Sequence, residues 1–190
     1  KSNLETYLET APEVEPEDAP AAVAEEKPAE AAAQETAPSA GEKHTLCSPV
    51  TGTVHPITEA PDDAFASKMM GDGFFVYPTV GEVLAPADGE VVFVFDTKHA
   101  IGMKSADGTE YLLHIGVDTV ALGGKGFEVF VEAGQQVKKG DRLMTFDIDY
   151  IRANATSDAC LVIFTGLPEG TSVEMTATGE VKALDPVARI

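Results

Sequence analysis

His99 and His114 are the two residues of this chain whose types and spacing best suit them to do chemistry together. They flank Asp107-Gly108, a dipeptide typical of a tight turn between two β-strands. If residues 105–108 form a four-residue hairpin loop, Lys104 pairs with Thr109. Counting back along both strands from this pair places the two histidines directly opposite each other. Directly opposed side chains on one sheet face have Cβ atoms about 4.5–5.5 Å apart. The sequence therefore predicts a site with two neighbouring imidazoles.

A pair of imidazoles can divide the work of a group transfer. A neutral imidazole is a nucleophile near neutral pH, because its unperturbed pKa is about 6.5, and a second ring can donate its N–H to the transferred group. The two-residue period of a strand places Thr97, Ile101 and Leu112 on the same face as the histidines. A hydroxyl beside the imidazoles and an apolar surround indicate a reactive site.

The elements that must position this site are β-strands. After Lys43, short runs of Val, Phe and Ile alternate with Gly, Pro and Asp clusters, which predicts an all-β fold, an antiparallel β-sandwich or barrel with short helices. The two expected helices cover 65–70 and 148–155, the second with help from Asp147 and Asp149 at its start. The expected strands are 52–54, 73–78, 81–84, 89–95, 129–131, 142–146, 160–164 and 172–175.

The first 43 residues have a different character from the rest. Between Ala11 and Lys43, 11 of the 33 residues are Ala, 8 are Glu and 5 are Pro, so we expect a disordered linker over 11–43. Residues 1–10 carry Leu4, Tyr7 and Leu8 at helical spacing and suggest the tail of a preceding domain. The folded domain is expected to span 44–190, and a chain that begins with Lys is expected to be a piece of a longer protein.

Charge and composition narrow the function classes. The formal net charge of −19 argues against a nucleic-acid partner and favours a basic protein partner. Cys47 and Cys160 form no CxxC pattern and suggest reduced, buried thiols of a cytoplasmic protein. No run approaches the roughly 18 apolar residues of a membrane span, so we expect no direct membrane contact.

The histidine hairpin and a series of ordered motifs carry a family resemblance over roughly 46–190. The chain resembles the IIA domain of the glucose/N-acetylglucosamine/β-glucoside class of the bacterial phosphoenolpyruvate:sugar phosphotransferase system, as the C-terminal domain of a fused IICBA or IIBA permease. The motifs that carry the resemblance are Thr97-x-His99-Ala100-Ile101-Gly102, Leu113-His114-Ile115-Gly116-Val117-Asp118, Ser48-Pro49-Val50-Thr51-Gly52, Met70-Gly71-Asp72-Gly73, Ala85-Pro86-Ala87-Asp88-Gly89 and Gly134 to Asp141.

The resemblance implies a phosphoryl carrier. His114 would be phosphorylated at Nε2 by phosphorylated HPr, and His99 would stabilise the phosphoryl group. Thr97 would orient His99, and the Gly116 carbonyl would hold the other nitrogen of His114. A cysteine of a IIB domain would then accept the group and phosphorylate the incoming sugar, with no cofactor and no metal required.

The resemblance also implies a docking face for HPr and the IIB domain. Apolar residues would contact both partners, acidic residues would meet their Lys or Arg side chains, and the isolated domain would be monomeric. The expected apolar residues are Phe65, Met69, Met70, Phe95, Leu112 and Val120, with Phe65, Met69 and Met70 the most exposed, and the expected acidic residues are Asp62 and Asp118. His44 and His55 are expected to be surface histidines.

Three other readings stay open at this point. A biotinyl or lipoyl carrier domain shares the Ala85–Val91 and Val131–Asp141 half-motifs, with Lys104 near the hairpin tip as a mimic of its modification site. A zinc hydrolase would take His99, His114 and Asp118 as ligands, although incidental zinc between the two histidines is also conceivable. A regulatory domain would bind and inhibit other proteins according to its phosphorylation state.

Overall fold

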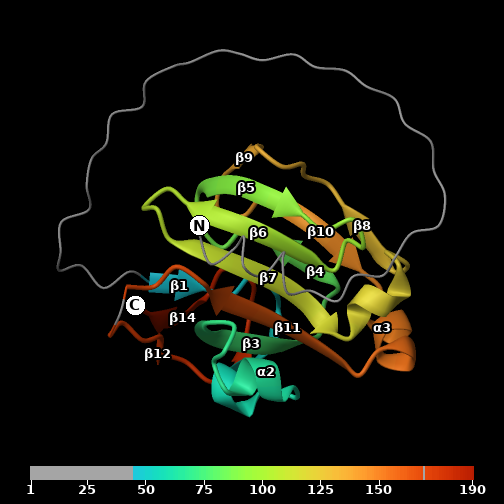
Figure 1. Ribbon diagram of the computed structural model, residues 1–190, viewed down its shortest axis with the longest axis horizontal. Coiled ribbons are helices and arrows are strands. Elements are labelled where there is room, and N and C mark those ends of the chain that lie inside the picture. Colours follow the sequence, from blue (N-terminus) through green and yellow to red (C-terminus); the bar gives the residue numbers. More distant parts are fainter. Residues whose placement is uncertain (1–44, 169) are drawn as a thin grey trace.

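The computed structural model describes residues 45–168 and 170–190 (Figure 1). The expected tail at 1–10, the expected linker at 11–43 and His44 lie outside the described residues. The strands are β1 Thr45–Cys47, β2 Gly52–Pro56, β3 Asp72–Pro78, β4 Glu82–Leu84, β5 Gly89–Val94, β6 Ala100–Ser105, β7 Glu110–Val117, β8 Phe127–Val129, β9 Gln136–Val137, β10 Arg142–Phe146, β11 Ser157–Phe164, β12 Glu174–Met175, β13 Gly179–Val181 and β14 Pro186–Arg189. The helices are η1 Ile57–Glu59, α2 Asp63–Ala66, η2 Thr119–Leu122 and α3 Ile148–Asn154.

The described strands form one large sheet and two small ones, and their pairings are antiparallel. The eight-stranded sheet has the order β13-β2-β3-β11-β7-β6-β5-β9, and the three-stranded sheets have the orders β1-β14-β12 and β4-β10-β8. Strand β11 lies at the centre of the large sheet between β3 and β7, although these three strands are far apart in sequence (Figure 1). The predicted antiparallel all-β class is confirmed.

The two faces of the large sheet serve different purposes. One face packs against the small sheets and builds the main core, which includes Leu113, Met103 and Val162. The opposite face carries a second apolar cluster that includes Leu112 and Phe65, covered by the segment of η1 and α2. Adjacent residues of β7 point to opposite faces because side chains alternate along a strand. His114 shares the parity of Leu112 and therefore belongs to the second face.

Most predicted strands occur with small shifts. The strand expected at 129–131 is β8 at Phe127–Val129, because β10 pairs with it between Phe127 and Val129. The strand expected at 172–175 is reduced to Glu174–Met175, the two residues that pair with β14. Both differences come from the partner strand, whose position a local pattern does not contain.

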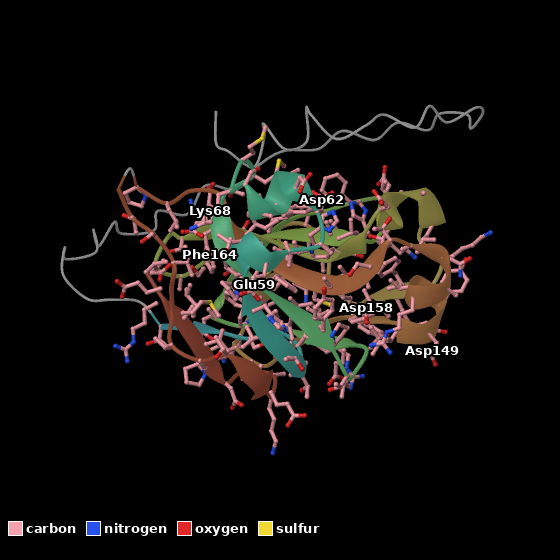
Figure 2. The ribbon with its side chains drawn as sticks, turned by 90° about the horizontal axis from the view of Figure 1, so that it is seen from below. Glu59, Asp62, Lys68, Asp149, Asp158 and Phe164 are labelled. Atoms are coloured by element: carbon pink, nitrogen blue, oxygen red, sulfur yellow. The ribbon has the colours of Figure 1, made fainter. Side chains whose placement is uncertain are left out.

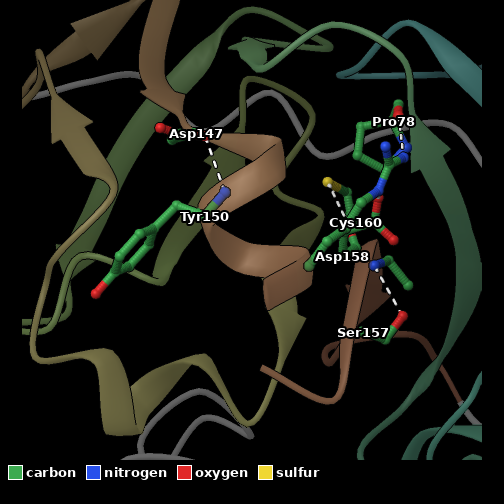
Figure 3. A network of polar contacts seen from close by, with 8 residues as sticks. Pro78, Asp147, Tyr150, Ser157, Asp158 and Cys160 are labelled. Carbon is green, nitrogen blue, oxygen red and sulfur yellow. Dashed lines mark hydrogen bonds and ion pairs between the residues drawn. The ribbon is translucent and has the colours of Figure 1, made fainter. Parts of the chain in front are cut away.

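The two predicted helices fare differently. Helix α3 begins as expected after Asp147, whose carboxylate accepts a hydrogen bond from the Tyr150 backbone N–H at 2.9 Å (Figure 3). Helix α2 is shorter than the predicted 65–70 and covers only Asp63–Ala66, after the N-cap residue Asp62. Lys68 has a left-handed backbone (φ 61°), which ends the helical geometry (Figure 2 labels Asp62 and Lys68).

The predicted register of the histidine hairpin is wrong by one residue. Lys104 pairs with Glu110 and not with Thr109, and the residue opposite His114 is Ala100. The connection therefore has one residue more than the expected four-residue loop. A one-residue slip moves side chains to the other sheet face, so Ile101 joins the main core instead of the histidine face.

Candidate active site

His114 lies in the middle of β7, a strand that has a neighbouring strand on each side. It is flanked by Leu161 of β11 on one side and by Ala100 of β6 on the other. Its side chain is buried, with 6% of its surface exposed. The surrounding sheet holds the imidazole in one place, so a group bound to it would have a fixed orientation.

His99 reaches His114 by a different route from the one predicted. It precedes β6 and lies in the bend that connects β5 to β6, where Lys98 adopts a left-handed backbone (φ 57°). The His99 carbonyl accepts a hydrogen bond from the Ile115 backbone N–H at 2.8 Å. The two imidazole rings lie 4.9 Å apart between centroids, with their planes at 78°. The predicted juxtaposition is therefore present, although the strand register that was expected to produce it is not.

Lys98 helps to position His99, and the sequence pattern did not predict this role. Its left-handed backbone departs from the pleat just before His99, which lets the histidine leave the strand alternation. Gly124 packs against this bend. A Cβ atom on Gly124 would lie 3.7 Å from the Lys98 side chain and 3.8 Å from the Thr97 carbonyl. Lysine is uncommon at positive φ, so no residue-type signal marked the position.

Thr97 contacts His99 directly. Its Oγ1 lies 2.6 Å from Nδ1 of His99 in a hydrogen bond. A hydrogen bond at Nδ1 leaves Nε2 as the ring atom of His99 available to another group. The structure thus brings together the three residues that the sequence placed in the site.

The C-terminal end of β7 and the following η2 shape the other side of His114. Gly116 has φ +76°, and a Cβ atom on it would lie 2.4 Å from the Thr119 side chain. The Thr119 hydroxyl is fully buried and donates to the Ile115 carbonyl at 2.7 Å. A hydrogen bond with the Gly116 backbone acts on the His114 ring, and the Nδ1 atom of His114 is closed off from solvent. Nε2 is therefore the nitrogen that His114 can present to a reactant.

Burial keeps both imidazoles neutral at physiological pH. It lowers the pKa of His99 to about 4. It lowers the pKa of His114 to about 3, with a further lowering from the charge of a protonated His99 and an opposing effect of the Gly116 hydrogen bond. A neutral imidazole has a free lone pair, so the arrangement provides a nucleophile beside a ring that can donate a hydrogen bond.

Aromatic rings border the imidazoles. Phe65 lies 5.3 Å from His114, and Phe95 lies 5.0 Å from His99, both between ring centroids. Among the described residues, no group of three or more His, Cys, Asp and Glu side chains is placed to hold a metal ion. Asp118, the third zinc ligand of the hydrolase reading, instead accepts a hydrogen bond from the Thr156 hydroxyl.

Similarity to known proteins shows the family of this chain. The family described as phosphoenolpyruvate-dependent sugar phosphotransferase system, EIIA 1, matches residues 44–169. The chain belongs to this EIIA family. It is 51% identical over 125 residues to the glucosamine-specific EIICBA component of the phosphotransferase system of Bacillus subtilis (strain 168). The match covers 66% of this chain but only 20% of that relative's length.

A solved EIIA structure agrees with the fold. The glucose permease IIA from Mycoplasma capricolum superposes with a TM-score of 0.73 at 40% sequence identity, over 78% of this chain and 96% of that one. The EIIA assignment also accounts for the half-motifs that suggested a biotinyl or lipoyl domain. Lys104, the mimic of a modified lysine, lies within β6 and pairs with Glu110.

The predicted docking face of this EIIA chain is only partly exposed. Met69 is 81% exposed, whereas Met70, Phe95 and Val120 are half-buried. The expectation that Phe65 is exposed is wrong, because it is 8% exposed and packs against His114. Leu112 is 1% exposed and supports the site from within the second apolar cluster, so it offers no contact surface.

The two predicted acidic docking residues have structural roles as well. Asp62 caps α2, where its carboxylate accepts from the Ala64 backbone N–H at 2.9 Å. Asp118 is exposed and has a left-handed backbone (φ 61°) at the start of η2. His55, expected at the surface, is partly exposed, forms a 3.2 Å hydrogen bond with the Glu59 carboxylate and stacks on Phe75. In the described part of the chain, no helix has the length and apolar character needed to cross a membrane.

Proposed function

We propose that this EIIA chain is a phosphoryl carrier that uses His114 as its phosphorylated residue. The lone pair of His114 Nε2 attacks the phosphorus of phosphorylated HPr, a P–N bond forms to His114, and the P–N bond to the donor histidine breaks. In the second step the thiolate of a IIB cysteine attacks the same phosphorus, and His114 leaves as a neutral imidazole. The phosphoryl group is conserved through both steps, and no oxidant or metal takes part.

The observation that carries this proposal is the pair of buried imidazoles 4.9 Å apart. Burial lowers the pKa of His114 to about 3, which supports a neutral nucleophile at every physiological pH. Phosphoryl transfer needs little covalent chemistry from a protein and depends mainly on positioning and on donors for the phosphoryl oxygens. A histidine held in the centre of a sheet, with a second ring beside it, supplies both.

His99 is the donor in this proposal, and Thr97 is its positioning residue. The 2.6 Å hydrogen bond between Thr97 Oγ1 and His99 Nδ1 directs Nε2 of His99 toward the phosphoryl oxygens. A bound phosphoryl dianion favours the protonated form of a neighbouring histidine, so its arrival raises the pKa of His99. Protonation of His99 then strengthens its hydrogen bond to the transferred group.

The partners follow from the family. The Bacillus subtilis relative is named as an EIICBA component, which supports a IIB domain in the same polypeptide as the acceptor. HPr is the donor that the family implies. We infer that the chain works at the cytoplasmic face of such a permease, where a linker at 11–43 tethers it near IIB and raises its effective concentration there. Met69 and its half-buried neighbours form the contact surface around the histidines.

Intact-mass analysis after incubation with phosphoenolpyruvate, enzyme I and HPr tests the proposal. The wild-type chain is expected to gain one acid-labile phosphoryl group, and His114→Ala is expected to gain none. His55→Ala is the matched control, because it removes a histidine of the same sheet that lies outside the site. Phosphorylation of His114→Ala, or its absence from the wild type with active enzyme I and HPr, would overturn the assignment.

A further inference from the structure

A cavity lies on the face of the large sheet opposite the histidines. It has a volume of about 90 Å³ and opens between β1 and the β6–β7 hairpin. Its walls include Cys47 of β1, Tyr111 of β7 and Phe164 of β11, together with Ser105 and Thr109. Tyr111 and Phe164 belong to the main core, which the large sheet separates from the histidine face.

The thiol of Cys47 contacts the side-chain amine of Lys139. Its Sγ lies 3.0 Å from Nζ of Lys139. Cys47 is 7% exposed, whereas Lys139 is exposed at the surface. The backbone N–H of Lys139 donates to the Asp88 carboxylate at 2.7 Å, which holds the turn that presents the lysine. The phosphoryl chemistry proposed above uses neither residue.

Tyr111 provides an independent sign that the cavity accepts a polar molecule. Its side chain is 97% buried, since only 3% of the residue is exposed. Within residues 45–168 and 170–190, its hydroxyl has no hydrogen-bond partner. Burial and the charge of Asp107 raise the pKa of Tyr111, so the hydroxyl stays protonated and able to donate. A buried donor without an acceptor is costly, and a small polar guest would remove that cost.

The size of the cavity limits that guest to a small molecule. A water molecule occupies about 30 Å³ in the liquid, so the space holds about three water-sized groups. A peroxide such as hydrogen peroxide fits this volume and accepts a hydrogen bond from a phenol. It would lie in the same cavity as the Cys47 thiol.

We propose that Cys47 and Lys139 form a covalent crosslink in response to a peroxide that Tyr111 binds in this cavity. First, the Cys47 sulfur attacks one peroxide oxygen, the O–O bond breaks, and the products are Cys47 sulfenic acid and water. The sulfur is oxidised by two electrons, and the peroxide is reduced. Second, the neutral Lys139 amine attacks the sulfur, the S–O bond breaks, and water leaves. The product is a sulfur–nitrogen bond between the two residues.

The condensation uses chemistry that sulfenic acids already show with nitrogen. They condense with a nearby backbone nitrogen to give a cyclic sulfenamide, and a thiol restores the cysteine. Lys139 offers a better nucleophile once its ammonium has lost a proton to solvent. The 3.0 Å separation places the amine next to the sulfur before oxidation begins.

Cys160 is a built-in control for this reaction. It is 1% exposed, and burial together with the charge of Asp158 raises the pKa of its thiol (Figure 3 shows both residues). Its Sγ contacts the Asp158 carbonyl at 3.6 Å and does not line the cavity. A peroxide that reaches Cys47 through the cavity should leave Cys160 reduced.

The test is peptide mapping of the full chain after treatment with hydrogen peroxide at mildly alkaline pH. The expected product is a crosslinked peptide pair containing Cys47 and Lys139, lighter than the two free peptides by two hydrogen atoms and cleaved by dithiothreitol. Lys139→Arg and Cys47→Ser should lose the crosslink, whereas Lys138→Arg should retain it as the matched control. Tyr111→Phe should slow the oxidation of Cys47.

Two results would overturn the proposal. One is a wild-type chain whose Cys47 stays reduced or stops at a dimedone-reactive sulfenic acid without joining Lys139. The other is a Tyr111→Phe variant whose Cys47 oxidises at the wild-type rate, which would remove the cavity from the mechanism. Neither result bears on phosphorylation of His114, because the two sites lie on opposite faces of the large sheet.

Discussion

At the scale of single residues, the reactivity of the site depends on two imidazoles that are buried without being charged. Burial lowers the pKa of His99 to about 4 and that of His114 to about 3. A charged ring would have no lone pair for attack, so the apolar environment created by Phe65 and Phe95 favours the nucleophilic form.

The division of labour between the histidines predicts an asymmetric effect of substitution. His99→Gln keeps an N–H donor near His114 but cannot become positively charged, so the variant should still accept a phosphoryl group from HPr. Onward transfer to a IIB domain should fall by roughly a hundredfold, the usual contribution of a positioned acid–base group. Rapid-quench assays of both half-reactions measure the two rates separately. Equal onward transfer by wild type and variant would refute the assigned role of His99.

Thr97 should act through His99 and not on the phosphoryl group itself. Thr97→Val removes the 2.6 Å hydrogen bond while keeping the shape of the side chain, so we expect transfer to slow by about tenfold. Thr97→Ser restores the hydroxyl and should restore the rate. Long-range ¹H–¹⁵N spectra of the His99 ring provide a second readout, because the valine variant should shift its tautomer balance. A valine variant with the wild-type spectrum and rate would exclude this positioning role.

At the scale of elements, the histidine site depends on one bend and on the C-terminal end of one strand. The bend at 95–99 places His99 outside the strand alternation, with Lys98 at φ 57°. The C-terminal end of β7, where Gly116 has φ +76°, places the Gly116 backbone against the His114 ring. Strand β7 itself lies between β11 and β6, so its central residue has little freedom to move.

The C-terminal end of β7 should tolerate no side chain at Gly116. In Gly116→Ala, the new Cβ atom would lie 2.4 Å from the Thr119 side chain and 3.0 Å from the Ser157 carbonyl. We expect a loss of about 3 kcal/mol in the free energy of unfolding, together with a large loss of phosphoryl acceptance. Urea denaturation and the mass assay measure the two effects.

Gly123→Ala is the control for backbone strain alone. Gly123 is also left-handed (φ 59°), but a Cβ atom on it would meet nothing within 4 Å. It should therefore lose only about 1 kcal/mol and keep phosphoryl acceptance. If the two alanine variants lost equal stability and activity, the packing of Gly116 against Thr119 would not be what matters.

Sequence patterns predicted much of this at the element scale, and the failures have clear physical causes. Alternating Val and Phe runs with Gly and Asp turns are local signals, so β3, β5, β10 and α3 were predicted close to their true bounds. The hairpin register was wrong because the left-handed Lys98 and the longer connection are not encoded by residue type. The burial of Phe65 and Leu112 depends on η1 and α2 covering the sheet, which is a long-range event.

At the scale of the whole molecule, the two proposed reactive sites lie on opposite faces of the large sheet. Phosphoryl transfer is proposed on the face covered by α2, and the Cys47–Lys139 pair lies by the main core on the other face. The net charge of −19 gives the molecule an electrostatic field that attracts basic partners, HPr among the expected ones.

The lowered pKa values also predict how global stability depends on pH. Between the unfolded pKa of about 6.5 and the folded values near 4 and 3, the unfolded chain binds more protons than the folded one. Above about pH 6.5 these histidines therefore do not lower the free energy of unfolding. As the pH falls below about 6.5, the free energy of unfolding decreases by roughly 1 kcal/mol per pH unit for each histidine.

Urea denaturation between about pH 7.5 and pH 5 measures this dependence before most carboxylates titrate. The double variant His99→Gln/His114→Gln should show a clearly flatter profile over that range than the wild type. An identical slope in both proteins would mean that the histidines are not held neutral by burial.

The central claim is that neutral His114 carries the phosphoryl group on Nε2 while His99 assists. The most direct measurement is the long-range ¹H–¹⁵N spectrum of the histidine-labelled chain before and after phosphorylation by enzyme I and HPr. The account predicts a phosphorus-coupled shift of Nε2 of His114, and protonation of His99 without a phosphorus coupling. A phosphorus coupling at His99, or at Nδ1 of His114, would contradict it.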